Sequence, residues 1–268
     1  MAELTTFGEM ISKNQFKFVR QLEQKKYRRR EGLFVAEGAK VVGDLMQHSQ
    51  PRMLFATSEY LRNSLLLSDH SGTPIFSNEG SEVVEVSPDE LRRLSFLQHP
   101  QQVLALFPLP SPSHSLTPSS SHLSLALDGV QDPGNLGTII RIADWFGIEN
   151  IYCSEDTVDA WNPKVVQATM GSIARVNIIY MNLPEMLDTL PDDFPVYGTF
   201  LDGENIYQQP LSENGLIVMG NEGNGISEAV RSRITHRLLI PSFRQGDTAE
   251  SLNVAIATAI TCSEFRRK

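Results

Sequence analysis

Residues 123–147 decide the fold, and they read LSLALDGVQDPGNLGTIIRIADWFG. The first five residues are short and apolar, which is typical of a buried strand. A polar, glycine-rich turn follows, and after it apolar side chains recur at the spacing of one helix face: Leu136, Ile139, Ile140, Ala143 and Phe146. A buried strand, a turn and a helix in this order predict an α/β unit with parallel strands.

The same alternation continues toward the C-terminus. The pattern predicts strands at 151–153, 176–180, 195–200, 216–219 and 237–240, and helices at 163–171, 226–234 and 251–265. Short strands that alternate with helices favour a mostly parallel sheet covered on both faces.

The N-terminal part predicts a smaller α/β domain. We expect a basic helical segment at 10–30, strands at 32–36, 53–57, 74–76 and 102–107, and helices at 38–47, 58–66 and from Ser87 onward. Residues 108–122 are rich in Pro and Ser and predict an exposed linker. The expected organisation is therefore a domain at 1–107, a linker at 108–122 and a second domain at 123–268.

Composition excludes several classes of protein. The chain has 268 residues, 41% hydrophobic and 21% charged, which excludes a wholly disordered chain and a coiled coil. It contains no apolar run of membrane-spanning length, and its N-terminus lacks the pattern of a signal peptide. Two cysteines, Cys153 and Cys262, form no metal-ligand motif, so we expect no zinc site and a location in the reducing cytoplasm.

Charge is unevenly distributed along the chain. The net charge is −9, yet residues 13–30 hold eight cations against one acid, Glu23. Such a local excess can neutralise phosphates of a nucleic acid even on an acidic protein. A solvated basic helix face explains the same charges, and composition alone leaves both interpretations open.

Three loops have a composition that is unusual for connectors. The first follows the strand at 123–127 and contains Asn135 at a helix start and Arg141 as the only cation of that helix. Glycines at a helix N-terminus expose main-chain N–H groups to an anion or a ribose phosphate. Helix capping by Asn135 and a solvated Arg141 are the structural alternatives.

The second loop reads IVMGNEGNGI at 217–226, directly after a predicted strand. Its glycines let a ligand approach the main chain, but the GxGxxG pattern of a dinucleotide site is absent. The third loop leads into the last helix, where Ser251 and Asn253 either cap the helix or offer donors to a ligand.

Taken together, these segments resemble the SpoU (TrmH-type) RNA ribose 2′-O-methyltransferases of the SPOUT class. The matching stretches are DGVQDPGNLGTIIRIADWFG (128–147), NPKVVQATMGSIARV (162–176), IVMGNEGNGIS (217–227) and IPSFRQGDTAESLNVAIATAI (240–260). RREGLFVAEG (29–38) is similar to the family's L30e-like substrate-binding domain, so the resemblance covers nearly the whole chain.

The resemblance implies a parallel sheet whose segment from about 216 to 259 forms a deep trefoil knot holding S-adenosylmethionine. Main-chain groups of Gly220, Ile240 and Leu252 match the positions that contact the cofactor, and Thr199 lines the same pocket. The polar insert at 243–248 departs from the family pattern, so the contacts of that loop are not carried over.

The implied reaction moves a methyl group from a sulfonium to a ribose 2′-hydroxyl, with no metal and no covalent intermediate. Arg141 matches the catalytic arginine. A guanidinium stays protonated at neutral pH, so orienting the hydroxyl is as plausible a role as base action. Asn135 would position that arginine or the ribose, Glu222 would hold the arginine by charge-assisted bonds, and Ser251 and Asn253 would lie near the reacting centre.

The family also implies partners. It acts as a homodimer, and the apolar last helix, which ends near Phe265, is the candidate surface. The substrate is RNA, with ribosomal RNA favoured over transfer RNA, and its candidate contacts are Lys13, Lys17, Lys25, Lys26, Arg28, Arg29 and Arg30. Two alternatives are a non-catalytic RNA-binding or ribosome-assembly protein and a hydrolase that pairs Ser251 with His236, although GxSxG is absent.

Overall fold

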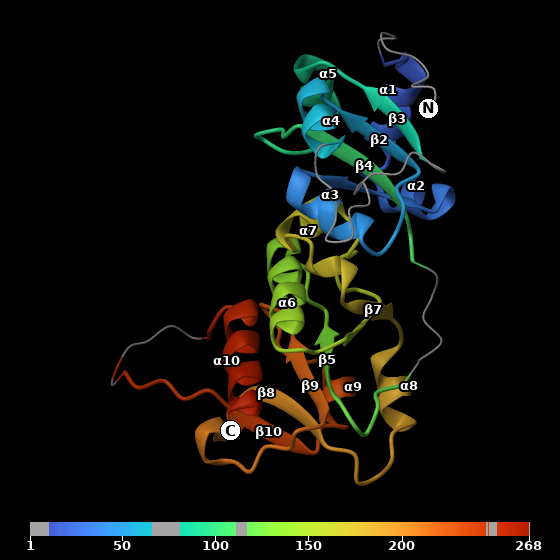
Figure 1. Cartoon of the computed structure of the whole chain (residues 1–268). Coiled ribbons are helices and arrows are strands. Elements are labelled where there is room, and N and C mark those ends of the chain that lie inside the picture. Colours follow the sequence, from blue (N-terminus) through green and yellow to red (C-terminus); the bar gives the residue numbers. More distant parts are fainter. Residues whose placement is uncertain (1–10, 66–80, 111–116, 245, 247–250, 268) are drawn as a thin grey trace. The chain divides into compact units, whose positions relative to one another are not determined.

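The computed structural model describes residues 11–65, 81–110, 117–244, 246 and 251–267 (Figure 1). The chain divides into two compact units. The first unit contains residues 1–110 together with 161–174, and the second contains residues 111–160 and 175–268. Residues 111–116 of the expected linker lie outside the described ranges, as does the strand expected at 74–76.

The second unit is built on a sheet of six parallel strands in the order β10-β8-β9-β5-β6-β7. The strands are β5 (Leu123–Asp128), β6 (Asn150–Cys153), β7 (Asn177–Tyr180), β8 (Val196–Asn205), β9 (Gly215–Gly220) and β10 (His236–Leu239). All six residues of β5 are buried, because neighbours flank it on both sides and helices cover both faces. The predicted parallel sheet is confirmed.

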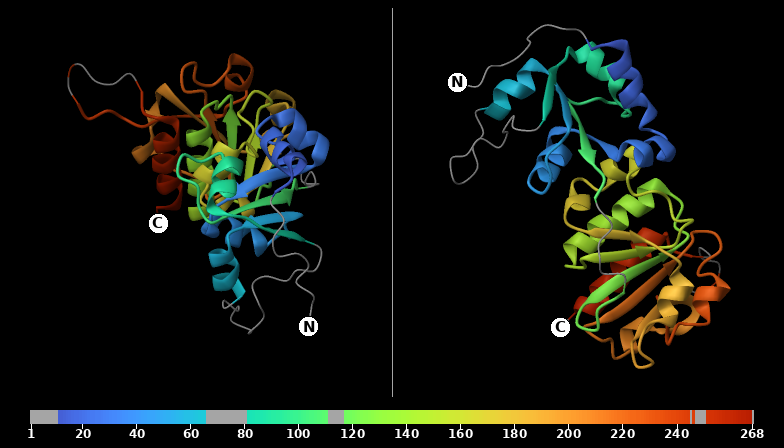
Figure 2. Two further views of the ribbon diagram at one scale, coloured as in Figure 1. Left: turned by 90° about the horizontal axis from the view of Figure 1, so that it is seen from above. Right: turned by 90° about the vertical axis from the view of Figure 1, so that its right-hand side faces the viewer.

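Helices of the second unit pack on opposite faces of this sheet (Figures 1 and 2). The helices are α6 (Pro133–Trp145), α8 (Leu183–Asp188), α9 (Glu228–Arg231) and α10 (Val254–Arg266), with a 3-10 turn, η2, at Ile206–Gln208. Helices α6 and α10 contact each other, whereas α8 and α9 pack over Ala126, Tyr152 and Val218. Alternate residues of the central strands therefore serve two separate apolar layers.

The first unit has a four-stranded mixed sheet in the order β1-β4-β2-β3. Its strands are β1 (Leu33–Glu37), β2 (Met53–Ala56), β3 (Glu82–Glu85) and β4 (Val103–Pro108). Its helices are α1 (Lys13–Gln21), α2 (Lys25–Glu31), α3 (Ala39–Met46), α4 (Ser58–Leu65), α5 (Pro88–Leu94) and α7 (Pro163–Ala168), followed by a 3-10 turn, η1 (Ser172–Ala174). The helices α1 and α5 pack on one apolar cluster with Leu104 and Leu106.

Local sequence signals account for several boundaries in the first unit. Ser87 caps α5 and forms a reciprocal capping box with Glu90, and Pro88 occupies the first turn, so the helix start predicted at Ser87 is confirmed. The basic segment expected as one helix is two, because the chain leaves helical geometry at Gln24 before α2 begins. Trp161 and Phe34 pack with ring centroids 4.7 Å apart, which ties the 161–174 segment to β1.

Both cysteines are free and buried. In the part of the chain that the structure describes, no helix is both long and apolar enough to cross a membrane.

Candidate functional site

The candidate site lies where two neighbouring strands end. Asp128, the last residue of β5, pairs with Gly220, the last residue of β9, and the strands are parallel. The loops that follow them therefore leave the sheet at the same edge, where α/β proteins collect their ligands. One loop starts α6, and the other is the GNEGNG segment at 220–225.

Asn221 folds the second loop and ties it to the first. Its Nδ2 donates to the carbonyl of Gly129 at 2.6 Å, and its Oδ1 accepts from the N–H groups of Gly223 and Asn224 at 2.9 and 3.0 Å. The main chains of Asn221 and Gly225 also exchange two hydrogen bonds. Asn221 was not among the predicted site residues, although asparagine at the start of a turn is a recognisable signal.

Gly220 is required by the loop itself. A Cβ on this residue would lie 2.3 Å from the carbonyl carbon of Gly225 and 2.4 Å from the nitrogen of Ile226. These neighbours are main-chain atoms that cannot rotate away, so a larger residue at position 220 would distort the loop.

Glu222 lies over the start of α6. Its carboxylate accepts hydrogen bonds from Asn135 Nδ2 at 2.9 Å and from the N–H groups of Gln131 and Asp132, each at 3.3 Å. Partial burial raises the pKa of the Glu222 carboxyl, but the hydrogen bonds from Asn135 and the main chain outweigh burial and lower the pKa below its ordinary value. Glu222 is therefore an anion that accepts bonds from the first loop.

Asn135 connects Glu222 to the third segment. Its Oδ1 accepts from Asn253 Nδ2 at 2.9 Å, and Asn253 Oδ1 in turn accepts from the N–H groups of Ala255 and Ile256, which begin α10. A carboxylate can only accept, so it fixes the orientation of the Asn135 amide, and this fixes the amide of Asn253. Three segments that are far apart in sequence thus meet in one hydrogen-bonded network.

Arg141 lies apart from this network. It is exposed and follows Asn135 by six residues, which places it about 120° around α6 and about 9 Å along the helix axis. Among the residues placed by the structure, Arg141 makes no ion pair or hydrogen bond. The expected charge-assisted bond between Glu222 and Arg141 is therefore wrong for this structure, because Asn135 and two N–H groups occupy the carboxylate.

Ser251 is exposed at the end of the third segment and makes no hydrogen bond within the described ranges. His236 instead contacts Thr235 Oγ1 at 2.8 Å, and its ring packs 4.7 Å from that of Tyr197. The Ser251–His236 pair required by the hydrolase alternative is not formed.

The residues expected to hold S-adenosylmethionine share the same sheet edge. Gly220 is the last residue of β9, and Ile240 directly follows β10. Thr199 follows the last β8–β9 pair, Gly198–Val218, and its hydroxyl donates to Met219 Sδ at 3.7 Å, so it lies level with the end of β9. Leu252 is 49% exposed, and its main chain has no hydrogen-bond partner in the described part of the chain. Free main-chain donors and acceptors beside an apolar side chain fit an adenine ring, which offers both polar edges and apolar faces.

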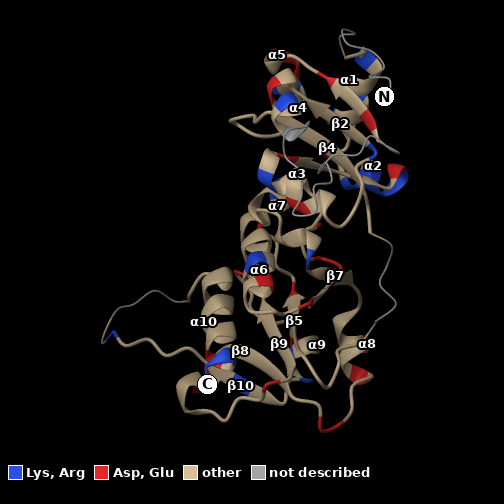
Figure 3. Ribbon diagram, viewed as in Figure 1, with Lys and Arg blue, Asp and Glu red and all other residues tan. Residues whose placement is uncertain are grey.

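Lys and Arg positions gather on α1 and α2 of the first unit (Figure 3). Some of these cations are exposed, and one is structural. Lys13, Lys17, Lys26, Arg29 and Arg30 are exposed, and Lys25 is half-buried. Arg28 is only 2% exposed and donates to the carbonyls of Leu22 and Glu23 at 2.8 and 2.7 Å. The prediction that Arg28 contacts RNA is wrong, because this guanidinium satisfies carbonyls at the break between α1 and α2.

No group of three His, Cys, Asp or Glu side chains within the described ranges is placed to hold a metal ion.

Comparison with known proteins identifies the family. The model of the SpoU rRNA Methylase family matches residues 122–263, and that of the MRM3-like substrate binding domain matches residues 13–105. The chain is 32% identical to the 23S rRNA (guanosine(2553)-2'-O)-methyltransferase RlmP of Bacillus subtilis, over 92% of this chain and 94% of that protein.

Two solved structures are similar over nearly their whole length. A protein assigned to the TrmH family of RNA methyltransferases, from Porphyromonas gingivalis, has a TM-score of 0.83 and 44% identity, covering 96% of this chain and 99% of that one. An AdoMet-bound rRNA methyltransferase from Sinorhizobium meliloti has a TM-score of 0.80 and 30% identity, covering 97% of each chain. The chain belongs to the SpoU rRNA methylase family and is an S-adenosylmethionine-dependent RNA methyltransferase.

Proposed function

We propose that this enzyme methylates a ribose 2′-hydroxyl of ribosomal RNA. The observation that carries the proposal is the Glu222–Asn135–Asn253 network, which joins three separate segments beside the candidate cofactor residues. The Bacillus subtilis relative is named as a 23S rRNA 2'-O-methyltransferase. This name supports both the ribose 2′-oxygen as the methylated atom and ribosomal RNA as the substrate. Such a substrate would place the enzyme in the cytoplasm. The alternative of a non-catalytic RNA-binding protein is not favoured, because the relatives are named as methyltransferases.

When bound, S-adenosylmethionine supplies a methyl group on a sulfonium, so that a C–O bond forms as a C–S bond breaks. The protein must align the hydroxyl with that methyl group and accept or pass on its proton. Asn135 and Asn253 are held too firmly by hydrogen bonds to move far, so their role is to fix the start of α6 and the start of α10 around the reacting groups.

Arg141 is the candidate catalytic residue. It has no partner among the described residues, so its donors are available to the 2′-hydroxyl and the neighbouring phosphate of RNA. A guanidinium remains protonated and offers a planar fork of donors, which suits orienting these oxygens rather than removing a proton. The hydroxyl proton then passes to the neighbouring phosphate or to water. We assign Ser251, which is exposed two residues before Asn253, as a further donor at this site.

A homodimer is part of the proposal. Helices α6 and α10 contact each other and expose Trp145 (85%) and Ile256 (53%). Trp145 lies one helical turn after Arg141, on the same face of α6, so a second copy covering this face would border the catalytic arginine. Apolar side chains as exposed as these favour burial against a partner.

The two domains would have different roles in the reaction. We assign residues 1–107 to RNA binding, 108–122 to a linker and 123–268 to catalysis, in agreement with the extents of the two family models. The trefoil knot is proposed for residues 216–259, and the sheet order supports it, because the chain after β9 crosses β8 to reach β10 at the sheet edge.

The test is transfer of tritiated methyl groups from S-adenosylmethionine to ribosomal RNA lacking the modification. We expect Arg141→Ala to lower kcat by about a hundredfold or more, and Arg141→Lys not to restore it, because a point charge lacks the planar fork. Calorimetry should show unchanged affinity for S-adenosylmethionine. Arg233→Ala is the matched control, since Arg233 pairs with Asp188 on the opposite face of the sheet.

If Arg141→Ala and Arg141→Lys both keep wild-type activity, the proposed role of Arg141 is contradicted. Failure of the wild type to methylate ribosomal RNA, or to bind S-adenosylmethionine, would contradict the proposed function itself.

A further inference from the structure

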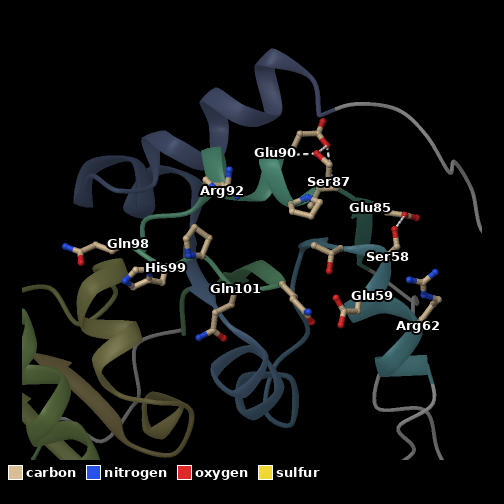
Figure 4. Close-up of a pocket in the computed structure, with 15 residues that line it drawn as sticks. Ser58, Glu59, Arg62, Glu85, Ser87, Glu90, Arg92, Gln98, His99 and Gln101 are labelled. Carbon is tan, nitrogen blue, oxygen red and sulfur yellow. Dashed lines mark hydrogen bonds between the residues drawn. The ribbon is translucent and has the colours of Figure 1, made fainter.

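The first unit contains a large polar cavity whose lining residues all belong to this unit (Figure 4). Its volume is about 1080 Å³, which is enough for a nucleotide with its flanking phosphates. Three segments form its walls: the start of α4 at 57–62, the start of α5 at 85–92, and the loop 98–102 before β4. In Figure 4, Ser58 and Arg62 lie on one side of the hollow, and Gln98 and His99 lie on the other.

The amide groups of this cavity are free to bind a ligand. Gln98, Gln101 and Gln102 line it, and their side chains make no hydrogen bond with any residue that the structure describes. All three residues are exposed. The Arg62 guanidinium is likewise exposed and has no ion pair within the described ranges.

Two of the carboxylates in the wall are already engaged. Glu85 accepts from the Ser58 hydroxyl, and Glu90 accepts from the N–H groups of Ser87 at 2.9 Å and Ile11 at 3.1 Å. Their acceptor capacity is directed into the wall. The groups that remain to face a ligand are the neutral amides, the Arg62 guanidinium, the His99 ring and the exposed carboxylate of Glu59.

The loop 98–102, which carries the three glutamines, is held at its N-terminal end by a buried carboxylate. Glu37 is 5% exposed and accepts from the Phe96 N–H at 2.8 Å and from the Ser95 hydroxyl. The guanidinium of Arg20 donates to the Ser95 carbonyl at 2.7 Å. These bonds fix the backbone from which the loop departs.

The other end of the loop is fixed by the sheet. The Thr57 N–H donates to the carbonyl of Gln102 at 3.0 Å, and the Gly38 N–H donates to Val103 at 2.9 Å. The loop is thus fixed at both ends, and the amides are presented without the entropy cost of ordering a mobile segment.

We propose that this cavity receives an unpaired nucleotide of the substrate RNA, with the glutamine amides on the base edge and Arg62 on a phosphate. An amide carries a donor and an acceptor side by side, which matches the paired groups on base edges. Bases reach such a cavity only when they are splayed out of a helix, as in loops and bulges. The proposal rests on the proposed function only in taking RNA as the substrate.

Helix α1, which carries two exposed lysines, is joined to one wall of this cavity. Helix α1 packs against α5, and the Ile11 N–H bonds to Glu90 in the cavity wall. Lys13 and Lys17 are exposed on α1, where they can neutralise phosphates next to the bound nucleotide.

The test compares Gln98→Ala/Gln102→Ala with the control Gln47→Ala/Gln50→Ala, which removes two exposed glutamines of the same unit outside the cavity. Gln101 is retained because it packs against Gly38. The probe is an unmodified 23S ribosomal RNA transcript containing 4-thiouridine. We expect the dissociation constant and the KM for this RNA to rise about tenfold in the cavity variant and to stay unchanged in the control.

Crosslinking gives a readout that does not depend on activity. Irradiation of wild-type protein with the same transcript should join RNA to peptides containing residues 57–62 or 95–102. Equal RNA affinity in the two double variants, or crosslinks that avoid these peptides, would overturn the cavity proposal even if the enzyme methylates RNA normally. If the wild type does not methylate RNA, the proposed function fails, while RNA affinity and crosslinks still decide the cavity.

Discussion

Glu222 and Arg28 show how neighbours change the role of a single charged residue. Glu222 was expected to hold Arg141, but its acceptors are taken by Asn135 and the first N–H groups of the α6 region. Arg28 belongs to a run of cations, yet it is buried against carbonyls. In both cases folding supplies the partners, a side-chain amide and main-chain N–H groups for Glu222 and carbonyls for Arg28, and a charge pattern does not reveal them.

For a single residue, the buried carboxyl of Glu37, we predict an effect of pH on the stability of the fold. Burial raises the pKa of its carboxyl above the ordinary 4.5, although bonds from Ser95 and Phe96 and the charge of Arg20 oppose the shift. A raised folded-state pKa gives stability that is complete below the ordinary pKa and is lost as pH rises through the raised pKa.

The free energy of unfolding of the wild type, relative to Glu37→Gln, should therefore fall as pH rises from about 5 to 8. Urea denaturation of both proteins at the two pH values measures the difference. A relative stability that increases with pH would show that the hydrogen bonds to Glu37 outweigh its burial.

At the scale of elements, the start of α10 depends on the side chain of its N-cap residue, Asn253. Asn253 accepts from two N–H groups of the helix start and also donates to Asn135, so one side chain both begins the helix and connects it to α6. Ser227 at the start of α9 makes no side-chain cap bond, and it provides a natural comparison.

We expect Asn253→Ala to lower the free energy of unfolding by about 1 kcal/mol, and Ser227→Ala to change it by much less. Chemical denaturation followed by circular dichroism measures both. Equal effects of the two substitutions would mean that the Asn253 cap adds nothing to the stability of the folded chain.

Elements with strong periodicity were predicted well, and elements defined by packing were not. The strand at β5 and the helix at α6 follow directly from apolar spacing. Helix α9 spans only Glu228–Arg231 although the pattern predicted 226–234, and α8 was not predicted. Short helices bury only one or two turns, so tertiary contacts rather than periodicity set their limits.

On the scale of the whole molecule, the exposed face of α6 and α10 predicts self-association. Ile256→Asp places a charge on the proposed interface, whereas Leu201→Asp changes a residue that is 74% exposed on β8. We expect sedimentation to show a dimer for the wild type and for Leu201→Asp, and a monomer for Ile256→Asp. A wild-type monomer at micromolar concentration would contradict the proposed dimer.

The parallel α/β class, the family and the three segments of the site could be predicted from the order of the amino acids, because strand length, helix periodicity and glycine placement are local properties. The pairing of polar groups depends instead on the folded chain, since Asn135, Glu222 and Asn253 are brought together by strand order and not by spacing. Folding likewise makes Arg28 structural and lines a cavity with the 98–102 amides, because burial depends on what the rest of the chain places around a residue.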